Sequence, residues 1–224
     1  MKKTFVASMV LLFCSITTWS LAQSANEQNA ESATPVSENV SRYPVADINA
    51  LPEDIKQNIH SAKEQLGFIP NFFKALGHRP DQLKAFEIYN KAAMNQDSGL
   101  SRAEKEMIIV VHSISNHCTY CVVSHGAMLR KLTGKPLITD QITTNYHEAD
   151  ISPRQKAMLD FALKVTTESH LINEEDFKVL HKHGFSNEDI WDIAAITAFY
   201  NMSNRMMNFL AVRPDLEFSK MARK

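Results

Sequence analysis

Helix start and stop signals recur along this 224-residue chain from Pro52 onward, and they constrain the fold more than any other feature. Ser101 followed by Glu104 is a capping box that begins a long apolar-periodic run. The chain has only 6 glycines and no Asn-Gly or Asp-Gly pair, so hairpin signals are absent. The pattern predicts an all-α helical bundle. The remaining signals are starts at Pro52, Pro80, Ser152, Asn173 and Ser186, and ends at Gly67, Leu132 and Gly184.

The apolar run at residues 108–111, IIVV, offers an alternative, because it precedes a Cys-x-x-Cys motif. Thioredoxin-like folds place such a motif at the start of a helix that follows a buried strand. The capping box at Ser101 instead puts this run inside a helix, and no other strand pattern is present to build a sheet. The helical interpretation is therefore favoured.

The N-terminal residues 1–22 predict a secretory signal peptide, with Lys2 and Lys3 before a short apolar run and small residues before a cut after Ala22. The run is too short for a bilayer span, and a short N-terminal anchor is the alternative. Residues 23–41 are polar and without aromatics, which predicts a disordered spacer. Residues 42–224 are then a single helical domain. We expect an exported, periplasmic protein with no membrane segment after cleavage.

The charge excludes one class of partner. The full chain has a formal charge of −1, which becomes −3 when Lys2 and Lys3 leave with the signal peptide. Such a chain lacks the basic footprint of a nucleic-acid-binding protein. Cleavage does not remove Cys118 or Cys121, and an exported protein with one close cysteine pair sits where disulfides persist.

The stretch NHCTYCVVSHG, residues 116–126, combines this cysteine pair with a histidine. Cys121 and His125 are four residues apart, so on one helix they share a face. Cys118 lies one turn earlier, near the helix start, where the dipole favours a thiolate. If the chain turns near residues 115–117, Glu106 on the preceding helix reaches His125 and orients it. The set then supplies a nucleophile, a base, an orienting acid and a second thiol.

Three other interpretations of the same residues remain. Zinc could be bound by Cys118, Cys121 and His125 with His117 or Glu106, but no second Cys/His pair at knuckle spacing occurs. A purely structural disulfide is possible, although so short a loop stabilises the fold weakly. The placement of Glu106 could also be chance. The redox interpretation is favoured, and it calls for no metal and no cofactor.

The order of the two thiols also has two possible answers. Because Cys121 shares a face with His125, we predict that Cys121 reacts with the substrate and that Cys118 resolves the product. The opposite order has support from thioredoxins, in which the first cysteine is the activated one.

The spacing Glu106-x11-Cys118-x2-Cys121-x3-His125 resembles the active-site signature of the alkylhydroperoxidase D (AhpD)-like proteins, within the carboxymuconolactone decarboxylase superfamily. The flanking sequences LGFIPNFFKALGHRPDQLKAF and FYNMSNRMMNFLA resemble its peroxidase-related branch. The resemblance implies an AhpD-like helical bundle that assembles as trimers or hexamers and reduces hydroperoxides. It also implies that Cys121 becomes a sulfenic acid, that Cys118 donates a proton and closes the disulfide, and that Glu106 and His125 relay protons. One departure is Tyr120, where the best-known members have a histidine.

A dithiol must reduce the resulting disulfide. The lipoyl donor known for the family is cytoplasmic, so we expect an unidentified donor, with a periplasmic thioredoxin-like protein as the hypothesis. The rival functions are a thiol–disulfide oxidoreductase acting on proteins, a lactone decarboxylase and a helical scaffold with an incidental disulfide. Tyr200, Asn201, Asn204 and Arg205 either line the cleft or make interhelical or subunit hydrogen bonds, His112 and His117 are expected to be packed or surface histidines, and residues 220–224 are expected to be a solvated tail.

Overall fold

The computed structural model describes residues 40–224, and within this range it is all-helical, with no strand. The predicted signal peptide and nearly all of the predicted spacer lie outside the described residues. The predicted all-α fold is confirmed. The helices are η1 (Ile48–Ala50), α2 (Glu53–Leu66), α3 (Asn71–Leu76), α4 (Pro80–Asn95), α5 (Arg102–Ser115), α6 (Thr119–Thr133), α7 (Ile138–Asn145), α8 (Pro153–Thr167), η2 (Ser169–Leu171), α9 (Glu174–Lys182), α10 (Asn187–Leu210) and α11 (Leu216–Lys220).

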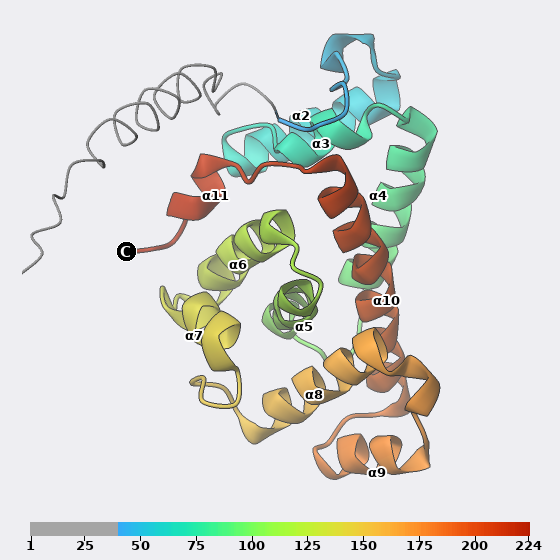
Figure 1. Ribbon diagram of the computed structural model, residues 1–224, viewed down its shortest axis with the longest axis vertical. Coiled ribbons are helices and arrows are strands. Elements are labelled where there is room, and N and C mark those ends of the chain that lie inside the picture. The colour runs from blue at the N-terminus through green and yellow to red at the C-terminus, as the bar shows by residue number, and fades with distance from the viewer. Residues whose placement is uncertain (1–39) are drawn as a thin grey trace, which may run out of the picture. The chain divides into compact units, whose positions relative to one another are not determined.

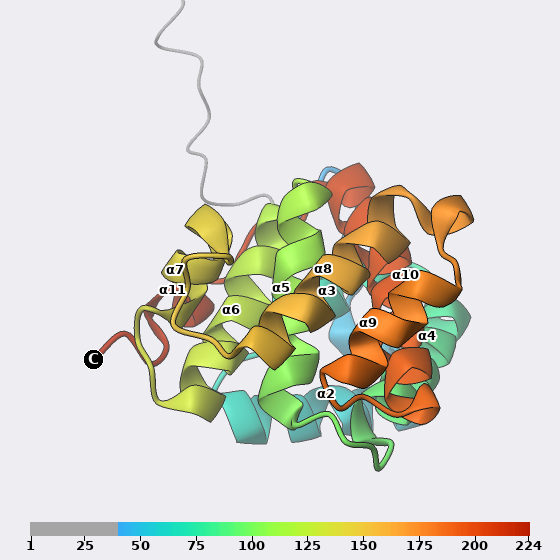
Figure 2. The ribbon, with the colours of Figure 1, turned by 90° about the horizontal axis from the view of Figure 1, so that it is seen from below.

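Helix α5 is the centre of the fold. Figure 1 shows it end-on, surrounded by α6, α7, α8 and α10. Its residues 104–113 are all buried, including the IIVV run that could have been a strand. Figure 2 shows α6 running beside α5. A helix this deeply buried can fix the position of side chains on the neighbours that pack against it.

The helix boundaries follow the predicted signals. The capping box of Ser101 and Glu104 is present at the start of α5, and Ser186 caps α10 in the same way. Gly134 ends α6 in the left-handed region, with φ of 65°, where glycine lacks the steric penalty of other residues. Each such cap is worth about 1 kcal/mol of helix stability.

The folded body begins earlier than predicted. Val40 and Ser41 were expected in the spacer, but both belong to the helical body. The last carbonyl groups of a helix lack partners within it, and here Ser41 Oγ and the backbone N–H of Arg42 each donate to Leu210 O at 2.8 Å. The backbone N–H of Arg213 donates to Val40 O at 3.0 Å. These bonds dock the first residues across the end of α10.

The C-terminal tail is also better ordered than predicted. Arg130 Nε donates to Met221 O at 3.0 Å, and Arg223 Nη1 lies 2.7 Å from Asp140 Oδ2. A buried guanidinium needs acceptors, and the end of the chain provides them. Residues 221 and 223 are therefore attached to α6 and α7.

Among residues 40–224, no helix is both long enough and apolar enough to cross a bilayer. The longest, α10, carries a line of buried side chains that packs on α5, α8 and α4.

Candidate active site

The Cys-x-x-Cys motif begins helix α6. Cys118 is the N-cap residue, and its sulfur accepts a hydrogen bond from the Cys121 backbone N–H at 3.4 Å. The two cysteines form a disulfide with their Cα atoms 5.4 Å apart. Both are buried, with Cys118 1% and Cys121 2% exposed. The turn before them contains His117, whose φ of 55° lies in the left-handed region that few non-glycine residues adopt.

Glu106 and His125 meet as the sequence predicted. The Oε2 atom of Glu106 lies 2.7 Å from Nδ1 of His125, which joins α5 to α6. Glu106 is 1% exposed, and its other oxygen lies 3.5 Å from Nε of Arg102. Because a carboxylate can only accept, His125 Nδ1 donates this bond, and the second ring nitrogen, Nε2, is left available.

A cavity of about 270 Å³ lies over this pair. Cys121 lines it together with His125 and Glu106, whereas Cys118 is not among its lining residues. Most of the other walls are apolar, so a molecule bound here would contact Cys121, His125 and Glu106 in a largely hydrophobic pocket. The apolar walls include Leu66, Phe72, Phe73, Phe86, Met128 and Phe218.

Tyr200 closes the polar end of the cavity. Its ring packs edge-on against the His125 ring, with the centroids 4.9 Å apart, and its hydroxyl donates to Asn90 Oδ1 at 2.7 Å. Burial and the nearby negative charge of Glu106 raise the pKa of the Tyr200 phenol. Tyr200 therefore stays protonated and holds the imidazole in place.

Tyr120 lies between the cysteines and has a tethering contact. Its hydroxyl oxygen accepts a hydrogen bond from the Phe72 backbone N–H at 3.2 Å, which attaches α6 to α3. Burial, followed by the negative charge of Asp215, raises the pKa of the Tyr120 phenol. Tyr120 therefore stays protonated at neutral pH and anchors α6 to α3.

The polar set on α10 divides into two. Of its four members, only Tyr200 lines the cavity. Asn201 and Asn204 make interhelical hydrogen bonds to Asn116 at the end of α5, and Arg205 donates to the backbone of its own helix at Asn201 O. The sequence left open whether these residues line the cleft or make interhelical hydrogen bonds. Tyr200 does the first, and Asn201 and Asn204 do the second.

Two histidines of the motif region lie in opposite surroundings. His117 is exposed, whereas His112 is fully buried on α5. Burial lowers the pKa of His112 to about 3, against the opposing effect of its hydrogen bond with Asn204. Its Nε2 is the one fully buried side-chain nitrogen or oxygen of residues 40–224 with no hydrogen-bond partner.

Sequence reasoning missed much of the cavity wall. Phe72 and Phe218 come from α3 and α11, short helices with no clear signal in the sequence. Arg102 had a detectable signal, because it precedes Glu106 by one helical turn. Asn90 had none.

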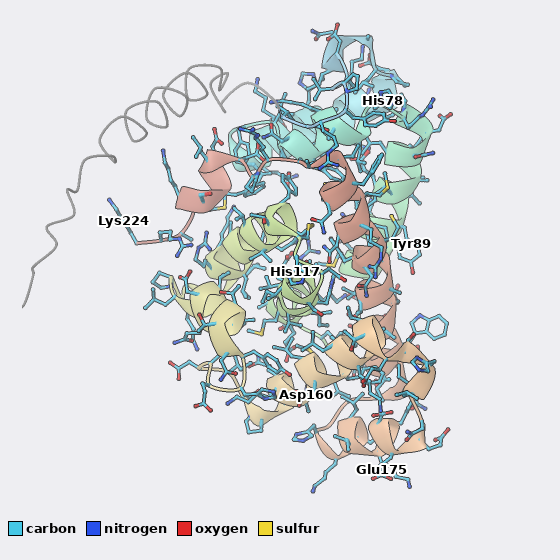
Figure 3. The ribbon with its side chains drawn as sticks, viewed as in Figure 1. His78, Tyr89, His117, Asp160, Glu175 and Lys224 are labelled. Carbon is cyan, nitrogen blue, oxygen red and sulfur yellow. A yellow bond between two sulfur atoms is a disulfide. The ribbon has the colours of Figure 1, made fainter. Side chains whose placement is uncertain are left out.

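A second, larger cleft of about 590 Å³ is lined mainly by residues of α3, α4 and α10. Phe86 lines both cavities and separates them. Figure 3 labels two of its lining residues, His78 and Tyr89, which lie on the same side of the molecule. Tyr43, Tyr89, Met202 and Phe209 leave large apolar surfaces exposed there.

Within residues 40–224, no group of three or more His, Cys, Asp or Glu side chains is arranged to hold a metal ion. The two thiol sulfurs, which the zinc alternative would use as ligands, are bonded to each other.

Comparisons with known proteins agree on the fold and the motif region. The model of the carboxymuconolactone decarboxylase family matches residues 80–136. The structure is similar to an alkylhydroperoxidase AhpD core, a peroxidase-related protein from Ralstonia eutropha JMP134, with 54% identity, 84% of this chain and 99% of that chain covered, and a TM-score of 0.83. It is also similar to a peroxidase-related protein from Silicibacter sp. TM1040, with 39% identity, 83% and 100% covered, and a TM-score of 0.76.

A more distant structure shares the fold alone. The debrominase Bmp8 is 20% identical, with 82% of this chain and 96% of that chain covered and a TM-score of 0.67. The comparison with curated proteins found no match.

Proposed function

This chain belongs to the AhpD-like, peroxidase-related proteins of the carboxymuconolactone decarboxylase family, and on that basis we propose that it reduces hydroperoxides through a dithiol/disulfide cycle of Cys121 and Cys118. The family membership supports an antioxidant, peroxidase-related role. The observation that carries the finer proposal is that Cys121 faces the cavity beside His125, whose imidazole is oriented by Glu106 at 2.7 Å.

In the first step, His125 accepts the proton of Cys121 and the resulting thiolate attacks the terminal oxygen of a hydroperoxide. The O–O bond breaks, the remaining alkoxide takes a proton and leaves as an alcohol, and Cys121 is oxidised to a sulfenic acid. The thiol of Cys118 then attacks the Cys121 sulfur, water leaves, and the disulfide forms. The peroxide has accepted two electrons from the two cysteines.

The largely apolar wall of the cavity supports organic hydroperoxides as substrates. An alkyl or aryl group would pack against Phe72, Phe86 and Met128 while the peroxide oxygen lies at Cys121. A small, fully hydrated peroxide gains nothing from these walls. Organic hydroperoxides should therefore have the lower KM.

The cycle is completed by an external dithiol, which supplies two electrons and two protons to the disulfide. We propose a periplasmic thioredoxin-like protein as this donor. Since Cys118 and Cys121 are 1% and 2% exposed, the donor must gain access through the cavity or after α3 or α11 moves away.

A thiol–disulfide oxidoreductase acting on proteins is the main alternative. The cavity beside Cys121 favours a small organic substrate over it, whereas the burial of both sulfurs limits a protein disulfide and a protein electron donor alike. The test compares peroxide consumption with insulin reduction by the same reduced protein, with candidate dithiols offered in turn. Insulin reduction without peroxide consumption would favour the alternative. A lactone decarboxylase would turn over without any change in the oxidation state of the thiols.

We also propose that the protein is exported after cleavage at Ala22 and acts in the periplasm. The basic start, the short apolar run and the small residues Ser20 and Ala22 support this. N-terminal sequencing from a fractionated host should find Gln23 as the first residue, outside the cytosol. An intact Met1 on cytosolic protein would refute the proposal.

Finally, we propose a homo-oligomer, with a trimer or hexamer expected from the family resemblance. Exposed apolar side chains on α10, which include Trp191, Met202 and Phe209, support an assembly that covers them. Light scattering at micromolar concentration should give a multiple of the chain mass, and a monomer mass would refute the proposal.

A further inference from the structure

The turn that presents Cys118 is attached to α10 by three asparagines on one side of that helix. Asn116 Nδ2 donates to Asn201 Oδ1 at 2.6 Å and to Asn204 Oδ1 at 2.9 Å. Asn208 Nδ2 donates to the backbone carbonyl of Asn116 at 2.8 Å. Both the side chain and the carbonyl of Asn116 are therefore held by residues one turn apart on α10.

The direction of these hydrogen bonds can be deduced from an arginine. Arg205 Nη1 lies 3.2 Å from the Asn201 side chain, and a guanidinium can only donate, so the atom facing it is Oδ1. Asn116 must then present its NH₂ group to that oxygen, and the second contact of this NH₂ must be the oxygen of Asn204. The same Asn204 oxygen therefore accepts from Nδ1 of His112, 3.1 Å away.

The turn held in this way is unfavourable by itself. His117, between Asn116 and Cys118, has a φ of 55°, in the left-handed region where a non-glycine residue is strained. Such a conformation persists only when surrounding contacts determine it. The contacts here are the Asn116 bonds on one side and the bond from Cys118 N to Ser113 O, at 2.9 Å, on the other.

We propose that Asn116 is the positioning residue of the thiol pair: its donor group, bound to α10, holds the turn so that Cys118 stays within bonding reach of Cys121 when both are reduced. A fixed turn raises the effective concentration of one thiol at the other, which stabilises the disulfide relative to the dithiol. The inference rests on the proposed dithiol/disulfide cycle but requires no peroxide.

The quantity to measure is the equilibrium constant of exchange with dithiothreitol. In this exchange, dithiothreitol gives two electrons and two protons to the Cys118–Cys121 disulfide and becomes a cyclic disulfide, so both sides balance. The fraction of each form is counted from the alkylation of Cys118 and Cys121 in the full-length protein, apart from that of Cys14. Because no hydroperoxide is present, a failed peroxidase assay leaves this result unaffected.

The test is a matched pair of amide-to-acid substitutions. Asn116→Asp keeps the shape but replaces the donor group by an acceptor facing two oxygens. We expect it to weaken disulfide formation about tenfold, which is a shift of about 30 mV for this two-electron couple. Asn201→Asp adds the same charge nearby but keeps the acceptor for Asn116 and Arg205. Because both donors still meet an acceptor, this variant should leave the equilibrium constant within about twofold of the wild type.

A third variant tests the proposal even if Asn116→Asp does not fold. Asn208 is exposed, and Asn208→Ala removes only the bond to the Asn116 carbonyl. It should shift the constant in the same direction by about two- to threefold, the effect of losing one ordinary hydrogen bond. The proposal is overturned if folded Asn116→Asp keeps the wild-type constant, if both acid variants shift it equally, or, where Asn116→Asp does not fold, if Asn208→Ala leaves it unchanged.

Discussion

The Nδ1 atom of His125 lies 2.7 Å from Oε2 of Glu106, and this contact joins α6 to α5 below the cavity that Cys121 faces. The carboxylate is 1% exposed, so it acts on the imidazole with little screening by water. Because Glu106 occupies Nδ1 of His125, the other ring nitrogen, Nε2, is the free one. The first two predictions concern this pair and the thiol that it serves.

Substitution of His125 or of Glu106, which orients it, should slow the oxidation of Cys121 by peroxide. In His125→Asn the proton acceptor is lost, the pKa of the Cys121 thiol rises, and oxidation by peroxide at neutral pH falls about 100-fold. In Glu106→Gln the imidazole loses its oriented charge partner, with a fall of about 10- to 100-fold. Both rates should recover as pH is raised and the thiol ionises unaided. Stopped-flow measurement across pH tests this.

His147 provides a matched control for these substitutions. It also lies near a carboxylate, 3.7 Å from Asp160 Oδ1, but the pair is exposed and neither residue lines the cavity. His147→Asn should leave the rate of Cys121 oxidation unchanged at every pH. An equal loss in His147→Asn and His125→Asn would show that the effect is not specific to the site.

The two thiols should differ in their fate after peroxide treatment. In Cys118→Ser, Cys121 should still react and stop at a sulfenic acid that a dimedone-type reagent labels, because no partner thiol remains. In Cys121→Ser, reactivity with peroxide should be largely lost. Mass spectrometry of labelled peptides tests the order. A label on Cys118 in Cys121→Ser, with none on Cys121 in Cys118→Ser, would reverse the assignment and favour the thioredoxin-like order.

His112 should make the fold sensitive to acid. Burial lowers its pKa from 6.5 to about 3, and the nearby positive charge of Arg205 acts in the same direction. Between these two pKa values the unfolded chain binds a proton that the folded chain excludes. The free energy of unfolding should therefore fall as pH is lowered from 6.5 towards 3, by up to about 1.4 kcal/mol per pH unit from this group.

Denaturant unfolding across pH checks this prediction in the wild type and in His112→Asn. The asparagine retains a donor for Asn204 but has no group that titrates. Its free energy of unfolding should be lower at pH 7, because a small cavity remains, and should decline less steeply towards pH 4. Parallel curves for the two proteins would assign the acid sensitivity to other groups.

A side chain at Gly126 should clash with Thr139 and destabilise the fold. A Cβ atom at Gly126 would lie 2.5 Å from Thr139 Cγ2, and Thr139 is held there by its hydroxyl, which donates to Gly126 O at 2.8 Å. Alanine gains up to about 1 kcal/mol in helix propensity, but the overpacking costs about 1–3 kcal/mol. We expect Gly126→Ala to lower the free energy of unfolding by about 1 kcal/mol.

Thr139→Ser separates the clash from other effects of the alanine. Serine removes the methyl group and keeps the hydroxyl, so Gly126→Ala in the Thr139→Ser background should be neutral or stabilising. Chemical denaturation of the four proteins in this double-mutant cycle gives the coupling. Equal destabilisation by alanine in both backgrounds would show that Thr139 Cγ2 is not the obstacle.

The sequence predicted the contact between Glu106 and His125 for a simple reason. Two helices joined by a short turn must pack side by side, so the turn at Asn116 and His117 determines which residues of α5 and α6 face each other. Local signals of capping and periodicity were sufficient for the helical class and for this pair.

The remainder of the site depends on contacts between distant segments. Phe72 and Phe218 line the cavity only because α3 and α11 pack over α6, and neither short helix has a strong signal of its own. The attachment of Asn116 to Asn201 and Asn204 was equally hidden, because a polar residue on a helix predicts no particular partner. The same limit applies to Ser41, which looks like its polar neighbours but caps α10.

The most direct test of the central claim is a single-turnover experiment with no added reductant, using reduced protein that lacks residues 1–22 and therefore Cys14. An organic hydroperoxide such as cumene hydroperoxide is mixed in excess, and the alcohol product, free thiols and cysteine linkages are counted by chromatography and mass spectrometry. The proposed cycle predicts one alcohol formed per chain, the loss of two thiols, and one Cys118–Cys121 disulfide. Hydroperoxide that remains unreduced while both thiols stay free, or that is consumed equally by a Cys118→Ser, Cys121→Ser double variant, would contradict it.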